Sequence, residues 1–283
     1  MKRKYMIIVL MAGALELTGC SQGTSNSAKN GTTGSENTII SESDIAILDT
    51  EDMFTERDRD TEYDESECTA ISLSDEETKC DSDGVKMDGQ TVTITEGGTY
   101  LLTGSLSNGS VVVDTDKTEK VQLILENVSI INEEGAGICV EQADKVFITL
   151  ADGSTNKIVS NSFTGNEDTN IDGAIFSRED LTLNGSGTLK ITSAAHGIVS
   201  KDDLVLTGGV YQIQSEKQGL SGKESVRIAD GTFTITSGTD AIHSEDTDED
   251  TKGFVYITGG VLTGCRRRWN FFFLCGAGRR RKL

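Results

Sequence analysis

The stretch LTLNGSGTLKI (residues 181–191) recurs as LVLTGGVYQI (204–213), VRIADGTFTI (226–235) and VYITGGVLT (255–263). Each copy has two short runs of β-branched and other apolar residues around a glycine-containing turn, which is typical of strands and tight turns. Its glycines at 187, 209 and 231 lie 22 residues apart, and Gly260 follows after 29. A second register agrees, because Ile175, Ile198, Leu220 and Ile242 step by 23, 22 and 22.

A repeat of this size buries its apolar face only by stacking on its neighbours, so the pattern indicates a solenoid. A period near 22 suits three short strands and three turns per coil, whereas a hexapeptide helix repeats near about 18 and a propeller blade near about 40. We therefore predict an all-β, right-handed, single-stranded parallel β-helix with about 22 residues per coil, preceded by a disordered tether. The alternative, a β-sandwich, requires three coincident registers.

The pattern also assigns side chains to the interior. Tyr211 and Phe233 share a repeat position with Leu189 and are expected to stack inside, whereas Tyr256 is expected on the surface. The other predicted inward residues are Leu181, Leu183, Ile191, Leu204, Leu206, Ile213, Val226, Ile228 and Ile235.

Composition excludes several classes of protein. The 283 residues include 46 acidic and 26 basic side chains, a net charge of −20, and no proline. A nucleic-acid-binding protein needs a basic face, so no nucleic-acid partner is expected. Collagen-like and proline-rich linkers are excluded as well. The long apolar run lies at the N-terminus, which does not fit a polytopic membrane protein.

The N-terminus resembles an export signal. Three basic residues at 2–4 precede an apolar run at 5–15 that is short for a membrane span. The following Leu17-Thr18-Gly19-Cys20 looks like a bacterial lipobox. We predict a lipoprotein signal peptide at 1–19, lipidation of Cys20 and a flexible tether at 20–50. The protein is then exported and lies at the cell surface, attached to the bacterial membrane only through its lipid. An ordinary signal peptide with a chance cysteine is the alternative.

The pattern stops after Gly264. Residues 265–283 form a basic, aromatic tail that begins CRRRWNFFFLC. Reading Cys265 to Asn270 one base later allows Ala-Gly-Asp-Asp-Gly-Ile, which is similar to SGTDAI at 237–242. The tail is therefore interpreted as frameshifted, and residues 51–264 as a C-terminally truncated β-helix. A genuine basic tail that binds the acidic body or the membrane is the alternative.

Several segments between residues 53 and 260 resemble a family of clostridial carbohydrate-binding β-helix lipoproteins. They are MFTERD (53–58), EYDESE (62–67), ADKVFITLADGS (143–154), NID (170–172), HGIVSKDDL (196–204) and KGFVYI (252–257). That family is similar in fold to pectate lyases. The resemblance implies binding of plant cell-wall polysaccharides, including cellulose and acidic pectic chains, with bound calcium.

Stacked coils turn repeat positions into surface columns. One column holds Asp172, His196, Gln218 and Asp240. A second holds Arg178, Lys201 and Lys223, followed by the acids Glu179, Asp202 and Glu224, and then by Asp180 and Asp203.

These columns supply the predicted site. Stacked carboxylates repel unless a cation neutralises them, and calcium takes oxygen ligands flexibly. Asp172, Asp202, Asp203 and Asp240 are therefore the predicted calcium ligands, although the neighbouring basic column could itself offset the acids. The predicted carbohydrate-binding residues are Arg178, Lys201, Lys223, His196 and Gln218. An acidic glycan such as polygalacturonate is favoured, with calcium bridging it to the acidic protein.

Three functional hypotheses follow. We predict a carbohydrate-binding protein without catalysis. A calcium-dependent polysaccharide lyase, which needs a base near the sugar C5 proton, is the second hypothesis, with Arg178, Lys201 and Arg227 as available bases. His196 and His243 are each expected to fill a turn position rather than act as a base. A structural adhesin or spacer is the third. For Cys68 and Cys80, a disulfide and two separate thiols both stay open.

Overall fold

The structure, a computed structural model, describes residues 52–164, 170–249 and 251–266, and three short strands, β1 (Met6–Val9), β2 (Leu17–Gly19) and β25 (Leu274–Cys275). Cys20, the whole predicted tether and most of the tail lie outside these residues. Lipidation, the tether and the frameshift therefore stay predictions.

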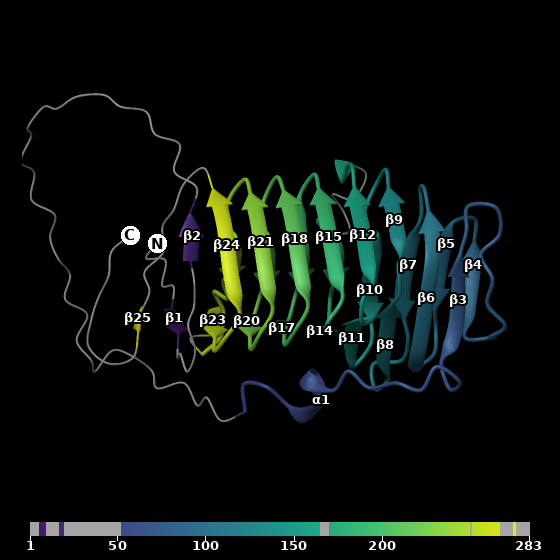
Figure 1. The fold of residues 1–283 in the computed structure, drawn as a ribbon, viewed down its shortest axis with the longest axis horizontal. Coiled ribbons are helices and arrows are strands. Elements are labelled where there is room, and N and C mark those ends of the chain that lie inside the picture. Colours follow the sequence, from purple (N-terminus) through teal and green to yellow (C-terminus); the bar gives the residue numbers. More distant parts are fainter. Residues whose placement is uncertain are drawn as a thin grey trace, which may run out of the picture.

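The chain folds into a right-handed parallel β-helix of about six turns (Figure 1). A full coil gives one strand to each of three sheets, named A, B and C here. Sheet A contains β3 (Thr69–Leu73), the first part of β6 (Gly98–Leu106), β8 (Lys120–Leu125), β11 (Lys145–Leu150), β14 (Asp180–Gly185), β17 (Asp203–Leu206), β20 (Ser225–Ile228) and β23 (Phe254–Ile257). Sheet B contains the end of β6, β9 (Ser129–Asn132), β12 (Thr155–Ser160), β15 (Thr188–Ser193), β18 (Val210–Ser215), β21 (Thr232–Ser237) and β24 (Val261–Arg266). Sheet C contains β4 (Val85–Asp88), β5 (Thr91–Ile94), β7 (Ser110–Asp114), β10 (Ile138–Gln142), β13 (Gly173–Ser177), β16 (His196–Ser200), β19 (Leu220–Gly222) and β22 (Ile242–Ser244).

The ends of the solenoid depart from this scheme. At the first coil, β4 and β5 form an antiparallel hairpin. At the last coil, β1 and β2 pair in parallel with β23 and β24, and β25 pairs with β1.

The predicted registers are confirmed. Leu181 lies opposite Leu204, and Leu204 lies opposite Val226. Ile198 joins Ile175 to Leu220 in sheet C. The spacing of 22 is local to the later coils, because the coil between β11 and β14 spans 35 residues and carries its extra length between β12 and β13.

The core is a continuous column of aliphatic side chains with one aromatic stack. The predicted inward residues are at most 3% exposed. The rings of Tyr211 and Phe233 stack with centroids 4.8 Å apart and planes 4° from parallel, as the shared repeat position predicted.

Sheet A is also covered on its outer face. Residues 53–60, named the strap here, include the short helix α1 (Glu56–Arg59), which packs against β14. Asp58 is 1% exposed and accepts a hydrogen bond of 2.7 Å from the Thr182 hydroxyl. Phe54 packs on Tyr256, with ring centroids 5.9 Å apart. The expectation of a surface Tyr256 is therefore wrong, because this residue packs with Met53 and Phe54 of the strap and is only 5% exposed.

Two further observations concern thiols and helices. Cys68, Cys80 and Cys139 are free thiols in the structure, which favours the separate-thiol interpretation of Cys68 and Cys80. Within the described ranges, no helix is long and apolar enough to cross a membrane.

Candidate functional site

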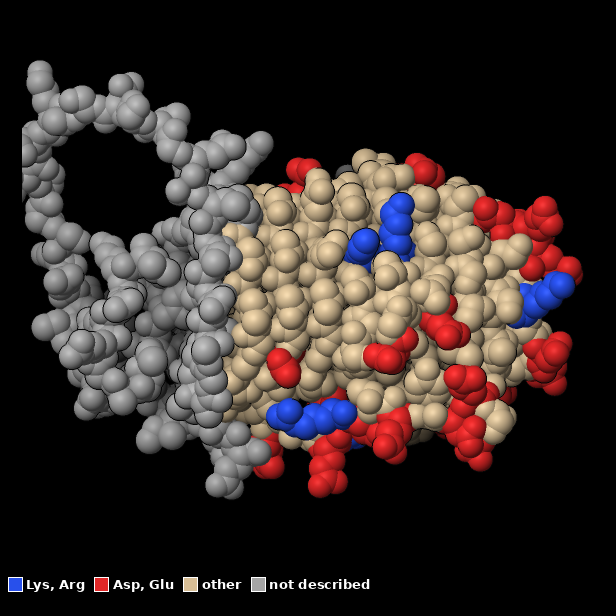
Figure 2. Space-filling view, in the orientation of Figure 1, with Lys and Arg blue, Asp and Glu red and all other residues tan. Residues whose placement is uncertain are grey.

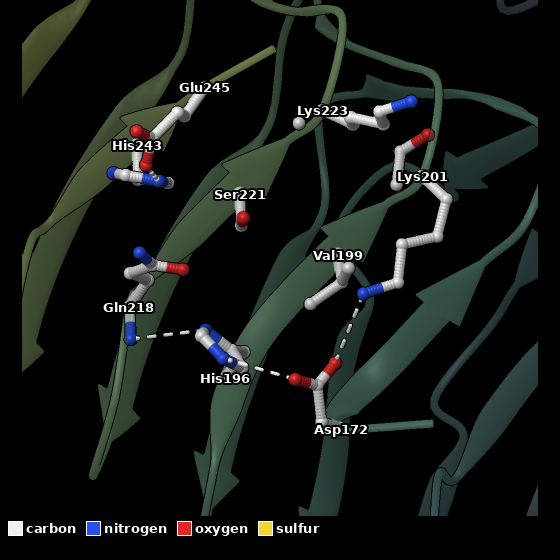
Figure 3. Close-up of a pocket in the computed structure, with 11 residues that line it drawn as sticks. Asp172, His196, Val199, Lys201, Gln218, Ser221, Lys223, His243 and Glu245 are labelled. Carbon is white, nitrogen blue, oxygen red and sulfur yellow. Dashed lines mark hydrogen bonds and ion pairs between the residues drawn. The ribbon is translucent and has the colours of Figure 1, made fainter. Parts of the chain in front are cut away.

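A polar groove of about 260 Å³ runs along the outer face of sheet C. It crosses the coils of β13, β16, β19 and β22 (Figure 3). Its lining consists of Asp172, His196, Val199, Ser200, Lys201, Gln218, Ser221, Gly222, Lys223, His243 and Glu245. Five of the predicted site residues meet here, namely Asp172, His196, Gln218, Lys201 and Lys223.

The parallel register explains why residues far apart in sequence meet. Ser177, Ser200, Gly222 and Ser244 lie side by side at the ends of their strands. The residues that follow them form one column, Arg178, Lys201, Lys223 and Glu245, at the edge of sheet C. Adjacent parallel strands are about 4.8 Å apart, so the backbones of neighbouring members of the column are separated by about the same distance.

Asp172 forms the centre of one end of the groove. Its carboxylate lies 3.3 Å from His196 Nε2, 3.6 Å from Lys201 Nζ and 3.8 Å from Lys217 Nζ. Burial alone would raise the pKa of Asp172, but the His196 hydrogen bond and the two lysine charges outweigh it and lower the pKa. Asp172 is therefore held as a carboxylate.

His196 bridges two coils through both ring nitrogens. The backbone N–H of Gln218 donates to Nδ1 over 3.3 Å, so Nε2 carries the proton that faces Asp172 (Figure 3). A general base needs a free lone pair aimed at the substrate proton. In this arrangement His196 positions Asp172 instead.

The other end of the groove is richer in acids. His243 lies between Asp240, at 3.6 Å, and Glu245, at 3.7 Å. Lys223 Nζ lies 3.6 Å from Asp246 and 3.8 Å from Asp248. The predicted calcium ligand Asp240 thus lies beside the groove, where its carboxylate contacts His243.

Arg178 is not part of the groove lining. Its Nε donates to Glu141 over 2.6 Å, and its guanidinium lies 5.5 Å from the centroid of the Phe176 ring. Glu141 precedes Arg178 in the same column, because Val140 pairs with Ser177.

The predicted acid Asp202 lies on the turn between sheets C and A, and Asp203 begins strand β17 directly after it; the two have different surroundings. Asp203 accepts from Ser225 Oγ at 2.5 Å and pairs with Arg227. Burial, followed by the nearby carboxylates of Asp180 and Glu224, raises the pKa of Asp202 to about 7. Among the described residues, no three His, Cys, Asp or Glu side chains form a metal-binding group.

Sequence reasoning missed Lys217 and Glu245 as members of the site and assigned His243 only to a turn. The register contains the signal for two of them. His243 pairs with Ser221 in sheet C. Glu245 has the same repeat position as Lys223, because the residues before them, Ser244 and Gly222, are paired. Lys217 lies in the turn between β18 and β19, so only the tertiary structure brings its ammonium to Asp172.

Comparison with known proteins fits this architecture. Residues 88–264 match the family model described as "Carbohydrate-binding domain-containing protein". The chain belongs to this family. A relative of the same description from Acetivibrio thermocellus is 41% identical over 184 residues, which cover 64% of this chain and 64% of the relative. The match therefore spans slightly less than two thirds of that relative's length.

A solved structure is also similar. It is described as the polysaccharide lyase-like protein from C. thermocellum, in a gadolinium derivative. The match has a TM-score of 0.66 and 30% sequence identity, and it covers 74% of this chain and 94% of the other. The fold and the carbohydrate-binding family are thereby established for this chain.

Proposed function

We propose that this protein binds acidic polysaccharide through the sheet C groove, without chemical turnover, as an exported protein anchored to the cell surface through Cys20. The observation that carries the proposal is the pair of lysines, Lys201 and Lys217, that approach the single carboxylate of Asp172. The family supplies the ligand class, carbohydrate.

The lysines are placed to exchange partners. Their distances to Asp172, 3.6 and 3.8 Å, exceed those of direct N–H···O hydrogen bonds, which are about 2.7–3.2 Å. Their side chains are 35% and 52% exposed. Exposed ion pairs of this kind contribute only about 0–1 kcal/mol, so a ligand carboxylate can attract both ammonium groups at little cost.

The net negative charge of the protein restricts where an acidic glycan can bind. Figure 2 shows acidic side chains along the lower edge and around the first coils, while the face over β12 to β24 is largely uncharged. A net charge of −20 repels a polyanion at long range. Contact with an acidic glycan therefore depends on local cations such as Lys201 and Lys217.

The groove geometry favours binding over lyase chemistry. His196 uses one ring nitrogen as an acceptor and directs the other at Asp172, and His243 faces two carboxylates. Neither arrangement presents a free lone pair to a sugar proton. The description of the structural neighbour as polysaccharide lyase-like keeps a lyase as the second candidate.

Among the predicted calcium ligands, Asp202 has the surroundings that best fit the ion. Asp172 and Asp203 already face cations, Lys201 and Arg227 respectively. Asp202 instead faces other carboxylates, and burial, followed by their repulsion, raises its pKa. A divalent cation at Asp202 would relieve this repulsion, and it would compete with Lys252 for the carboxylate of Glu224. We therefore propose Asp202 as the calcium ligand, at the turn rather than in the groove.

Affinity electrophoresis of the full chain in gels containing polygalacturonate tests the proposal. We expect retardation that is lost in the double variant Lys201→Met, Lys217→Met. It should persist in Lys190→Met, which removes an exposed lysine from sheet B. Retardation that is equal in all three proteins, or absent from the wild type, overturns the groove as a site for acidic glycan.

The same samples separate the other hypotheses. Release of unsaturated sugar, followed by ultraviolet absorbance, would identify a lyase. A folded chain with neither binding nor product would indicate a spacer. For calcium, we expect the wild-type melting temperature to rise with the ion and fall with a chelator, and this response to disappear in Asp202→Asn. An unchanged melting temperature contradicts the Asp202 site.

A further inference from the structure

The column that lines the groove changes charge along the solenoid axis. Lys201 and Lys223 occupy neighbouring coils, and Glu245 takes the same position in the next coil. Before Lys201 the column holds Arg178, which is neutralised by Glu141 at 2.6 Å. The basic part of the column is therefore short and is bounded at both ends.

The end around Asp172 has a surplus of positive charge. Lys201 and Lys217 share that one carboxylate, and the imidazole of His196 donates to it as well. An additional carboxylate from a ligand would complete the balance of one anion for each lysine. This part of the groove is named the basic end.

The end around His243 has the opposite balance. Lys223 is approached by both Asp246 and Asp248, and Glu245 and Asp240 flank His243. A ligand carboxylate placed here would meet like charges. A sugar hydroxyl, in contrast, can donate to the carboxylate of Glu245. This part is named the acidic end.

The two ends are separated by the spacing of the coils. Strands β16, β19 and β22 follow one another in sheet C at about 4.8 Å each, which is close to the advance of one sugar ring in an extended chain. A glycan lying along the solenoid axis would thus meet a different coil with each sugar (Figure 3).

We propose that the groove selects a mixed sequence, with one acidic sugar at the basic end followed by uncharged sugars toward the acidic end. A partially esterified uronan has this chemistry, and an uninterrupted polyuronate does not. The inference rests on the proposed function and deepens it, because it specifies how many carboxylates one groove accepts.

Titration calorimetry of the full chain with two matched ligands tests this selectivity. One ligand is trigalacturonate, and the other is the same trisaccharide with methyl esters on two of its three carboxylates. We expect the monoanionic ester to bind about two- to fivefold more tightly, the range set by one or two exposed charge contacts. Glu245→Gln should improve trigalacturonate binding selectively and narrow this gap. Asp230→Asn removes an exposed acid at another corner of the same coil and should leave the gap unchanged.

The outcomes distinguish the two proposals. Tighter binding of trigalacturonate by the wild type, or equal improvement of both ligands by Glu245→Gln, overturns the mixed-sequence inference while acidic-glycan binding stands. If neither trisaccharide binds and polygalacturonate does not retard the chain, the proposed function fails and the inference fails with it.

Discussion

Replacing Asp58 by asparagine should loosen the strap from sheet A. The Asp58 carboxylate lies 2.8 Å from Lys145 Nζ and accepts hydrogen bonds from the hydroxyls of Thr182, at 2.7 Å, and Thr55, at 2.8 Å. Burial raises the pKa of Asp58, but these partners together outweigh burial and lower it from 3.8 to about 2.

The shift sets the size of the effect. A depression of nearly two pKa units corresponds to about 2.4 kcal/mol of folding free energy at pH 7. Because the folded-state pKa is the lower one, this stability is present above pH 3.8 and is lost as the pH falls through about 2. At pH 3, about 1.3 kcal/mol of it remains. The neutral amide of the variant also leaves Lys145, only 14% exposed, without its anion, which adds to the loss at pH 7.

Urea denaturation of the full chain at pH 7 and pH 3 measures this difference. We expect Asp58→Asn to lower the unfolding free energy by about 2–4 kcal/mol at pH 7, and the gap to narrow by about 1 kcal/mol at pH 3. Asp60→Asn is the matched control on the same strap, since its ion pair with Arg57 is exposed and should change stability by less than about 0.5 kcal/mol. A gap below about 0.5 kcal/mol at pH 7, or one that does not narrow in acid, refutes the reasoning.

Three further substitutions test the stability of the β-helix, which is measured for each variant as the denaturation midpoint. Tyr211→Phe should stabilise the chain by up to about 1 kcal/mol, because the buried hydroxyl finds no partner among the described residues; destabilisation would contradict this. Gly185→Ala should cost about 2 kcal/mol, because φ is +94° and an added Cβ would meet the Leu150 carbonyl oxygen at 2.2 Å; an unchanged midpoint would show that the turn adapts. Asn184→Ala should cost about 1–3 kcal/mol of unfolding free energy and speed hydrogen exchange in the strap, because the Asn184 amide donates to the Asp60 carbonyl at 2.9 Å. Unchanged exchange in the strap would contradict the claim that this hydrogen bond holds the strap on sheet A.

The sequence by itself determined the solenoid, since each β-helix coil repeats the same short-range pattern. The spacing of Gly187, Gly209 and Gly231 predicted the stacking of successive coils, and the shared position of Tyr211 and Phe233 predicted their stack. Parallel in-register pairing also carried Lys201 and Lys223 into one column. The fold was thus accessible from the repeat, whereas the carbohydrate-binding class came from the resemblance of particular segments to a known family.

Only the tertiary structure decided what covers each face and which charges are already paired. The strap reaches sheet A from more than a hundred residues away and buries Tyr256, an arrangement that no local period records. Arg178 and Lys201 occupy equivalent positions, yet one is held by Glu141 and the other lines the groove. The repeat determines the backbone position of each residue and therefore the point from which its side chain projects. Its partner depends on contacts between neighbouring coils and turns, which vary from one repeat to the next.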